Sequence, residues 1–196
     1  AEKVARSIAA ARDHIEAQRF DAAEAALALQ EAPEDLAAPL ASVRRELWMA
    51  RAALDAVLKG LGQAIESKAA LRTRILDPAA GTWHEAEGII LDGRDGASLA
   101  AHRKGSTASL HFTWYDLEPS TLEALAGPAA AGADFKEGLL ILLLGARRTE
   151  PALGMLEDPS FPRAPRARYT ERLRIARGRR LGDLAEGMEK ERSALV

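Results

Sequence analysis

The sequence contains no cysteine, few aromatic residues and no long apolar run. Because the chain has no thiol, it has no disulfide, no thiolate metal site and no cysteine nucleophile. Aromatic residues make up only 5% of the chain while alanine is abundant, a bias typical of closely packed helices. The longest apolar run, Leu139 to Leu144, is far shorter than the ~20 residues of a membrane-spanning helix, so we expect no membrane insertion.

Recognisable catalytic motifs are missing as well. The chain has no GxxxxGKS or GxxxxGKT phosphate loop, no GxGxxG, no HExxH, no GxSxG and no kinase catalytic motif. We therefore predict no catalytic residue, no cofactor and no resident metal. An enzyme of unrecognised type is only the third functional alternative.

The composition is that of an ordinary folded protein. Hydrophobic residues make up 47% and charged residues 29% of the 196 residues, which excludes a disordered chain and allows one large domain or two small ones. The net charge of −2 provides no overall attraction to nucleic acid or to a membrane. The chain begins inside a helical pattern without methionine or a signal peptide, so we expect a fragment of a longer protein or a processed chain of unknown compartment.

Periodicity predicts an α+β fold in which helices dominate. In residues 1–76 we expect a helical hairpin, with Asp21 as the N-cap of its second helix, and a long helix over residues 36–71. Leucine recurs at every seventh position of this helix from Leu40 to Leu61, which is typical of a seam packed against another helix. The seam leaves two alternatives open, packing inside the chain or formation of a dimer.

Residues 77–118 change to an alternating pattern that predicts a small antiparallel β module. The strands are joined by Asp-Gly pairs in residues 92–96 and by a Lys-Gly-Ser turn at residues 104–106. Such a module is either SH3-like or a curled sheet of three to five strands, and it must lean on the helices. The strands are expected over residues 83–91, 97–102 and 109–115.

Residues 119–196 are predicted to be helical again. A short helix ends at Gly127-Pro128, the apolar run forms the next helix, and a short partner helix follows over residues 150–156. A final helix is expected over residues 166–193. The predicted architecture is therefore a set of helical hairpins and a long helix packed around the β module.

Two stretches resemble the helical hairpins of tetratricopeptide repeats. One carries Phe20, Ala23 and Leu27 at the large-small-large spacing of the second repeat helix, and the other has Ala152 and Leu156 after a turn. The layout is similar to accessory regions of bacterial multidomain proteins, among them regions attached to serine/threonine kinases. This resemblance implies an accessory, non-catalytic role.

The strongest candidate site is a run of arginines near the C-terminus. Eight arginines and one acid, Glu171, give residues 163–180 a net charge of +7, whereas residues 79–131 hold three basic and seven acidic residues. Arginine pairs with carboxylate or phosphate in a bidentate fork, so the run fits an anionic partner, nucleic acid, docking onto the acidic sheet, or a solvated helix face. The arginines that we take as candidate binding residues are Arg166, Arg168, Arg172, Arg174, Arg177, Arg179 and Arg180.

Weaker candidates lie in the β module. His102 and His111 flank its second hairpin, and imidazoles on one face suit zinc, although both also fit plain surface positions of a strand. Aromatic residues from Trp83 to Tyr115 form either a binding groove or the core of the sheet. Tyr115 is the one that we expect to be exposed, as a candidate binding residue.

Together these patterns favour a non-catalytic protein-interaction or regulatory module of a larger bacterial protein. It would act on a protein partner or on the remainder of its own parent chain. The alternative is the binding of nucleic acid or another anionic ligand through the arginine run.

Overall fold

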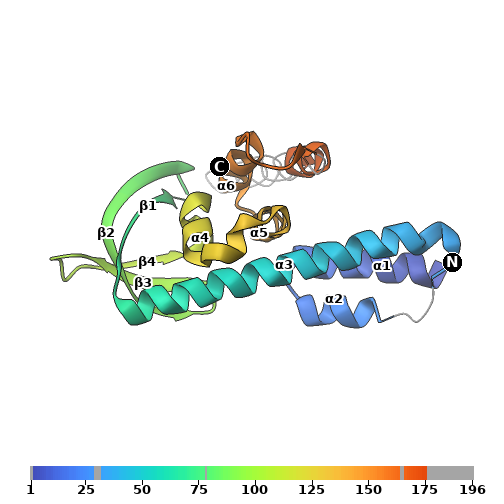
Figure 1. Cartoon of the computed structure of the whole chain (residues 1–196), viewed down its shortest axis with the longest axis horizontal. Coiled ribbons are helices and arrows are strands. Elements are labelled where there is room, and N and C mark those ends of the chain that lie inside the picture. The colour runs from blue at the N-terminus through green and yellow to red at the C-terminus, as the bar shows by residue number, and fades with distance from the viewer. Residues whose placement is uncertain (1, 29–31, 78, 164–165, 176–196) are drawn as a thin grey trace, which may run out of the picture.

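The computed structural model describes residues 2–28, 32–77, 79–163 and 166–175. It confirms a mostly helical α+β fold with one antiparallel sheet. The sheet lies at one end of the long helix α3, and the helices α1 and α2 lie along its other end (Figure 1). Within the described residues, no helix is long and apolar enough to cross a membrane.

The N-terminal helices form a hairpin that packs on α3. Helix α1 (Glu2–Glu16) turns at Gln18, whose φ is 55°, and α2 (Phe20–Ala26) runs back beside it (Figure 1). The predicted N-cap role of Asp21 is wrong, because α2 already begins at Phe20. The Asp21 carboxylate instead pairs with the guanidinium of Arg51 on α3.

Helix α3 (Glu34–Ser67) buries the predicted seam inside the chain. Leu40, Leu47 and Leu61 are at most 7% exposed, while Leu54 is half-buried. The seam is covered by α1, α4 and α5 of the same chain, so within one chain it is already packed. The helix ends at Ser67, four residues earlier than predicted, and its C-cap residue Lys68, whose φ is 52°, redirects the backbone into the first strand.

Two glycines allow neighbouring helices to approach α3 closely. Gly60 of α3 faces the backbone of α4 (Pro119–Ala126), and a Cβ placed there would lie 2.0 Å from the carbonyl oxygen of Leu125. Gly138 of α5 (Ala133–Gly145) faces the Met49 carbonyl in the same way, at 2.1 Å. Both glycines are therefore sites of backbone contact, where any side chain would push the helices apart.

The sheet has four strands in the order β1-β2-β3-β4. The strands β2, β3 and β4 lie close to the predicted ranges, but β1 precedes the predicted β module and lies in the last part of residues 1–76, which were expected to be helical. Its burial alternates along the strand, with Thr73 buried between exposed arginines, which is the period of a strand and not of a helix. The strands are β1 (Ala70–Asp77), β2 (Thr82–Asp95), β3 (Ser98–Arg103) and β4 (Ser109–Thr113).

Two local features of the sheet differ from prediction. Strand β2 continues through Asp92, where its register with β3 is irregular, and the chain turns only at Gly96, whose φ is 56°. Strand β4 stops at Thr113 because the Asp116 carboxylate accepts hydrogen bonds from the Thr113 backbone N–H and hydroxyl, at 2.8 and 2.6 Å. The following residues form the short 3-10 helix η1 (Trp114–Asp116) instead of extending the strand.

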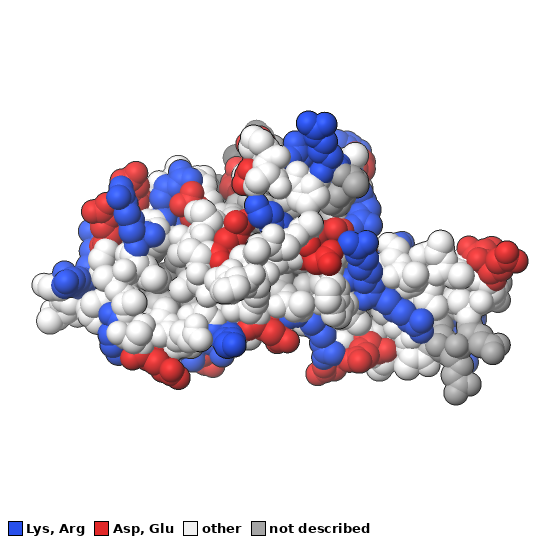
Figure 2. Space-filling model, in the orientation of Figure 1, with Lys and Arg blue, Asp and Glu red and all other residues white. Residues whose placement is uncertain are grey.

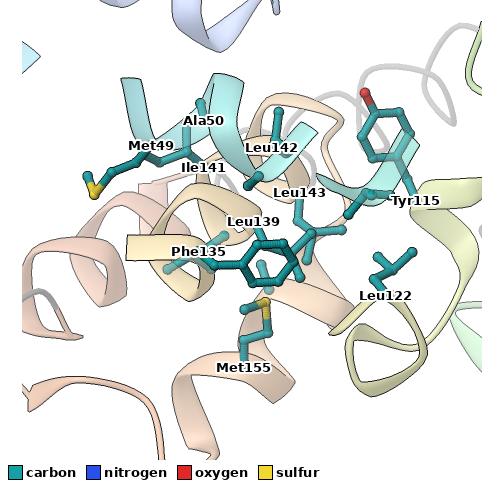
Figure 3. Packing of buried hydrophobic residues seen from close by; sticks show 14 of the residues in the cluster. Met49, Ala50, Tyr115, Leu122, Phe135, Leu139, Ile141, Leu142, Leu143 and Met155 are labelled. Atoms are coloured by element: carbon teal, nitrogen blue, oxygen red, sulfur yellow. The ribbon is translucent and has the colours of Figure 1, made fainter. Parts of the chain in front are cut away.

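The apolar run forms the centre of the core. Helix α5 is buried all round from Leu139 to Leu143, between α3 on one side and α6 (Thr149–Glu157) on the other (Figure 3). A second short 3-10 helix, η2 (Gly127–Ala131), joins α4 to α5. Residues 166–175 are helical, as predicted, and residues 176–193 of the predicted final helix lie outside the described residues.

Candidate binding cleft

A cleft lies where the sheet meets the C-terminal helices. It encloses about 210 Å3 between the β1–β2 pair, the start of α4 and the helix α6. This volume is below the roughly 300–1,000 Å3 of pockets that hold a drug-sized molecule, so it suits a side chain better than a whole cofactor. The residues that line it are Arg74, Trp83, Glu118, Pro119, Ser120, Glu123, Lys136, Glu150, Pro151, Gly154, Met155, Asp158 and Phe161.

The apolar part of the lining is held in place by the core. Met155 of α6 is 4% exposed and Phe161 is 2% exposed, so both present only an edge to the cleft. Trp83 of β2 contributes a half-buried indole, and the guanidinium of Arg74 lies 5.6 Å from the centroid of its ring. The Trp83 ring therefore already accepts a cation–π contact.

The charged part of the lining is predominantly acidic. Arg74 is bound to the carboxylate of Glu118, and the Lys136 ammonium lies 3.8 Å from Glu123 while donating to the Ser160 hydroxyl at 2.7 Å. Four carboxylates and two cations line the cleft, and the carboxylate of Asp158 also lies near the positive charges of Lys136 and Arg166.

Two of these carboxylates have shifted pKa values. Burial raises the pKa of Glu123 above its ordinary value, Lys136 opposes that shift, and the negative charge of Asp158 adds to it. The pKa of Asp158 is lowered instead, because its carboxylate accepts hydrogen bonds from the Ser160 backbone N–H and hydroxyl. Glu123 is thus a partly buried carboxylate beside another negative charge.

Four arginines of the run, from Arg166 to Arg174, make contacts inside the chain. Arg168 binds the carboxylate of Glu137, and lies 3.5 Å from that of Glu46. Arg172 lies 3.3 Å from Glu46 and 3.2 Å from Glu16. These acids belong to α1, α3 and α5, so of the alternatives for the run, docking onto the acidic sheet does not apply to Arg168 and Arg172.

Two of the three carboxylates of this arginine cluster are removed from water. Glu46 is 5% exposed and Glu137 is 8% exposed, and the buried hydroxyl of Tyr169 donates to Glu137 at 2.9 Å. Arg168 and Arg172 both stack on the Tyr169 ring, at 4.6 and 5.4 Å from its centroid. The final described helix is thereby attached to the body through both charge and apolar packing.

Two further candidate arginines of the run, Arg166 and Arg174, also have partners. Arg166 donates to the carbonyl oxygens of Asp158 and Phe161, at 2.8 and 3.0 Å, and so ties the final helix to one wall of the cleft. Arg174 pairs with Glu171 on the surface of its own helix. The candidates Arg177, Arg179 and Arg180 lie outside the described residues.

The candidate residues of the β module are placed differently from expectation. Tyr115 was expected to be exposed, and this is wrong, because it is 9% exposed and its hydroxyl donates to Gln18. His102 pairs with Ser109 across the hairpin and its Nδ1 lies 2.7 Å from the Asp92 carboxylate, whereas His111 lies opposite Ala100. Among the described residues, no three His, Asp or Glu side chains are grouped to hold a metal ion.

Comparisons with known proteins add no relative. No family model matches the chain, and neither the curated proteins nor the solved structures provide a match. The function of the cleft must therefore be argued from its own chemistry.

Proposed function

We propose that the chain is a non-catalytic interaction module that binds a segment of a partner protein in this cleft. The observation that carries the proposal is the combination of buried apolar side chains and charged side chains in the lining of the cleft. Recognition sites use this combination, because apolar contacts supply affinity and a few placed polar groups fix orientation. The small volume favours one or two inserted side chains.

A regulatory role is supported by the position of the final helix. Arg166 connects this helix to the backbone of Asp158 and Phe161, which form one wall of the cleft. Arg168 and Arg172 fix the same helix to α1, α3 and α5. A movement of the final helix would therefore alter the shape of the cleft.

Nucleic-acid binding through the arginine run is the weaker alternative. Each described arginine from Arg166 to Arg174 is engaged by a carboxylate or a carbonyl of the same chain. On the face drawn in Figure 2, basic and acidic side chains are interspersed, and no broad basic field is present there. A phosphate-tracking surface concentrates positive charge.

The proposal is tested by filling the cleft. Gly154 lines the cleft on α6, and a Cβ at this position meets nothing within 4 Å, so Gly154→Tyr should block the cleft while the chain still folds. Gly62 on α3 has the same open surroundings and lies outside the cleft lining, which makes Gly62→Tyr a matched control.

The measurement is binding of a defined panel of peptides with varied charge and hydrophobicity, read by NMR chemical shifts. We expect saturable binding to the wild type and to Gly62→Tyr, and loss of binding in Gly154→Tyr. Absence of binding by every peptide would overturn the proposal. Tight binding of an unselected DNA duplex at physiological salt would favour the alternative instead.

A further inference from the structure

We propose that β4 is the interface of a homodimer, in which the β4 strands of two copies pair antiparallel and join their sheets. This inference does not depend on the cleft, because no residue of β4 lines it. Two features carry it: the outer edge of β4 has unpaired backbone groups, and a second copy of the same strand can pair with all of them.

The register of the sheet fixes which backbone groups of β4 bond to β3. The Trp114 N–H, just after the strand, donates to the Ala97 carbonyl oxygen at 3.0 Å. In an antiparallel pair of strands, residues that exchange hydrogen bonds with the neighbour alternate with residues that do not. Counting back from Trp114, Leu110 and Phe112 are therefore the residues of β4 that bond to β3.

The residues between them direct their backbone groups away from β3. These residues are Ser109, His111 and Thr113, and the Thr113 N–H indeed bonds to the Asp116 carboxylate. The N–H and C=O groups of Ser109 and His111 have no hydrogen-bond partner among the described residues, since β3 is the only described strand beside β4. Two donors and two acceptors on each chain are therefore open to another strand.

The opposite edge of the sheet is covered in part by the same chain. There Ile75 of β1 pairs with Leu117, and the Glu118 N–H donates to the Arg74 carbonyl oxygen at 3.0 Å. The β4 edge has no such cover among the described elements, and β4 contains neither lysine nor proline, which proteins place on edge strands to prevent pairing. An exposed edge of this kind is a template for another strand.

A second copy of β4 fits this edge without leaving an open group. When Ser109 of each strand lies opposite His111 of the other, their outward groups form four hydrogen bonds between the copies. This register places Leu110 beside Leu110 of the second copy, on the sheet face where Ala101 of β3 is buried. Leu110 is half-buried in the single chain, so the pairing covers apolar surface, and β4 has no Lys, Arg, Asp or Glu to oppose it.

The absence of cysteine provides a sharp test, because an introduced cysteine is the only thiol of the chain. In Leu110→Cys the two cysteines would face each other in a pair without hydrogen bonds, whose Cα atoms lie about 4.5 Å apart, within the range of a disulfide. Phe112→Cys is the matched control. It lies on the same strand and face and is also half-buried, but its two copies would be more than about 13 Å apart.

Under mild oxidation, we expect Leu110→Cys to form a covalent dimer at least roughly tenfold faster than Phe112→Cys. A second variant tests the backbone pairing itself. His111→Pro removes an outward N–H and no hydrogen bond to β3, and proline is tolerated at such positions of edge strands. It should weaken the dimer roughly tenfold, because two of the four hydrogen bonds between the copies are lost.

Sedimentation over a range of concentrations measures the dimer, and circular dichroism confirms that each variant is folded. We expect a wild-type dimer that dissociates on dilution, because two strands of five residues bury little surface. A wild type that stays monomeric at every concentration would overturn the proposal, as would equal oxidation rates of the two cysteine variants. A dimer that folded His111→Pro leaves unchanged would place the interface elsewhere and overturn it as well.

Discussion

Gly60 lies where α3 passes the backbone of α4, and an alanine at this position tests that packing directly. The new Cβ would lie 2.0 Å from the Leu125 carbonyl oxygen and 2.5 Å from its carbonyl carbon. A backbone oxygen cannot rotate away, so the two helices must separate by roughly an ångström before the contact becomes tolerable. Helix α4 carries Glu123, so the separation would also displace one wall of the cleft.

The expected magnitude follows from two opposing effects. Overpacking a well-packed site typically costs about 1–3 kcal/mol, occasionally more, and contact with backbone places Gly60→Ala toward the upper end. Alanine recovers about 1 kcal/mol, because glycine is the poorer helix former. We expect Gly60→Ala to lower the free energy of unfolding by about 2 kcal/mol, which corresponds to a Tm about 4–8 °C lower for a chain of this size.

Gly62 provides the matched control two residues along the same helix. A Cβ there meets nothing within 4 Å, so Gly62→Ala retains only the gain in helix propensity and should stabilise by about 0.5–1 kcal/mol. Urea and thermal unfolding followed by circular dichroism measure both variants. Equal stabilisation by the two alanines would refute the close approach of α3 and α4.

Two further predictions concern charged groups. Arg168→Met should lower the free energy of unfolding by about 1–3 kcal/mol, because it removes a cation from the buried carboxylates of Glu46 and Glu137. The control Arg174→Met, in an exposed pair, should change the free energy of unfolding by less than about 0.5 kcal/mol. Similar losses for the two variants in chemical denaturation would contradict the burial of the cluster. The pKa of Asp92 is lowered, mainly by its hydrogen bond with His102. The ionised carboxylate therefore stabilises the fold at pH values above about 3.8, the ordinary pKa of the group, and this stabilisation is lost as the pH falls through the lower folded-state pKa. Asp92→Asn should therefore lower the Tm near neutral pH and have little effect at about pH 2, and a difference that does not change with pH would count against this linkage.

The parts of the fold that could be predicted are those set by local periodicity. The leucines of α3 recur with the period of a helical seam, and Leu40, Leu47 and Leu61 are indeed buried. The alternation in residues 109–113 likewise marked a strand, and the apolar run formed the buried helix α5. In each case the signal lies within one element and does not depend on what the element contacts.

The errors arose where distant residues decide the local structure. Tyr115 was expected on the surface because it continues the alternation of β4, but Asp116 ends that strand and Gln18, 97 residues earlier, receives the Tyr115 hydroxyl. Gly60 lies in a helix in which glycine is a poor helix former, and nothing in the sequence reveals that α4 crosses there.

The candidate site was only partly accessible to sequence reasoning. The arginine run was visible, but its partners were not, because Glu46 lies 126 residues from Arg172 and carries no local mark of burial. The cleft was missed entirely. Its lining comes from β1, β2, α4, α5, α6 and the segment after α6, and each contributes ordinary residues that form no motif. Only the three-dimensional arrangement brings them together.

The same long-range pairing has a consequence for synthesis of the chain. A ribosome adds roughly 5–20 residues per second, so Glu46 emerges about 6–25 seconds before Arg172, its partner 126 residues later. Met49 must likewise wait for Gly138, which brings α5 onto the seam of α3. During translation, α3 therefore exposes the part of its leucine face that α4 and α5 later cover, and the Glu46 carboxylate lacks its arginine partners. The nascent chain is an expected client for chaperones that shelter apolar segments until the C-terminal third has been made.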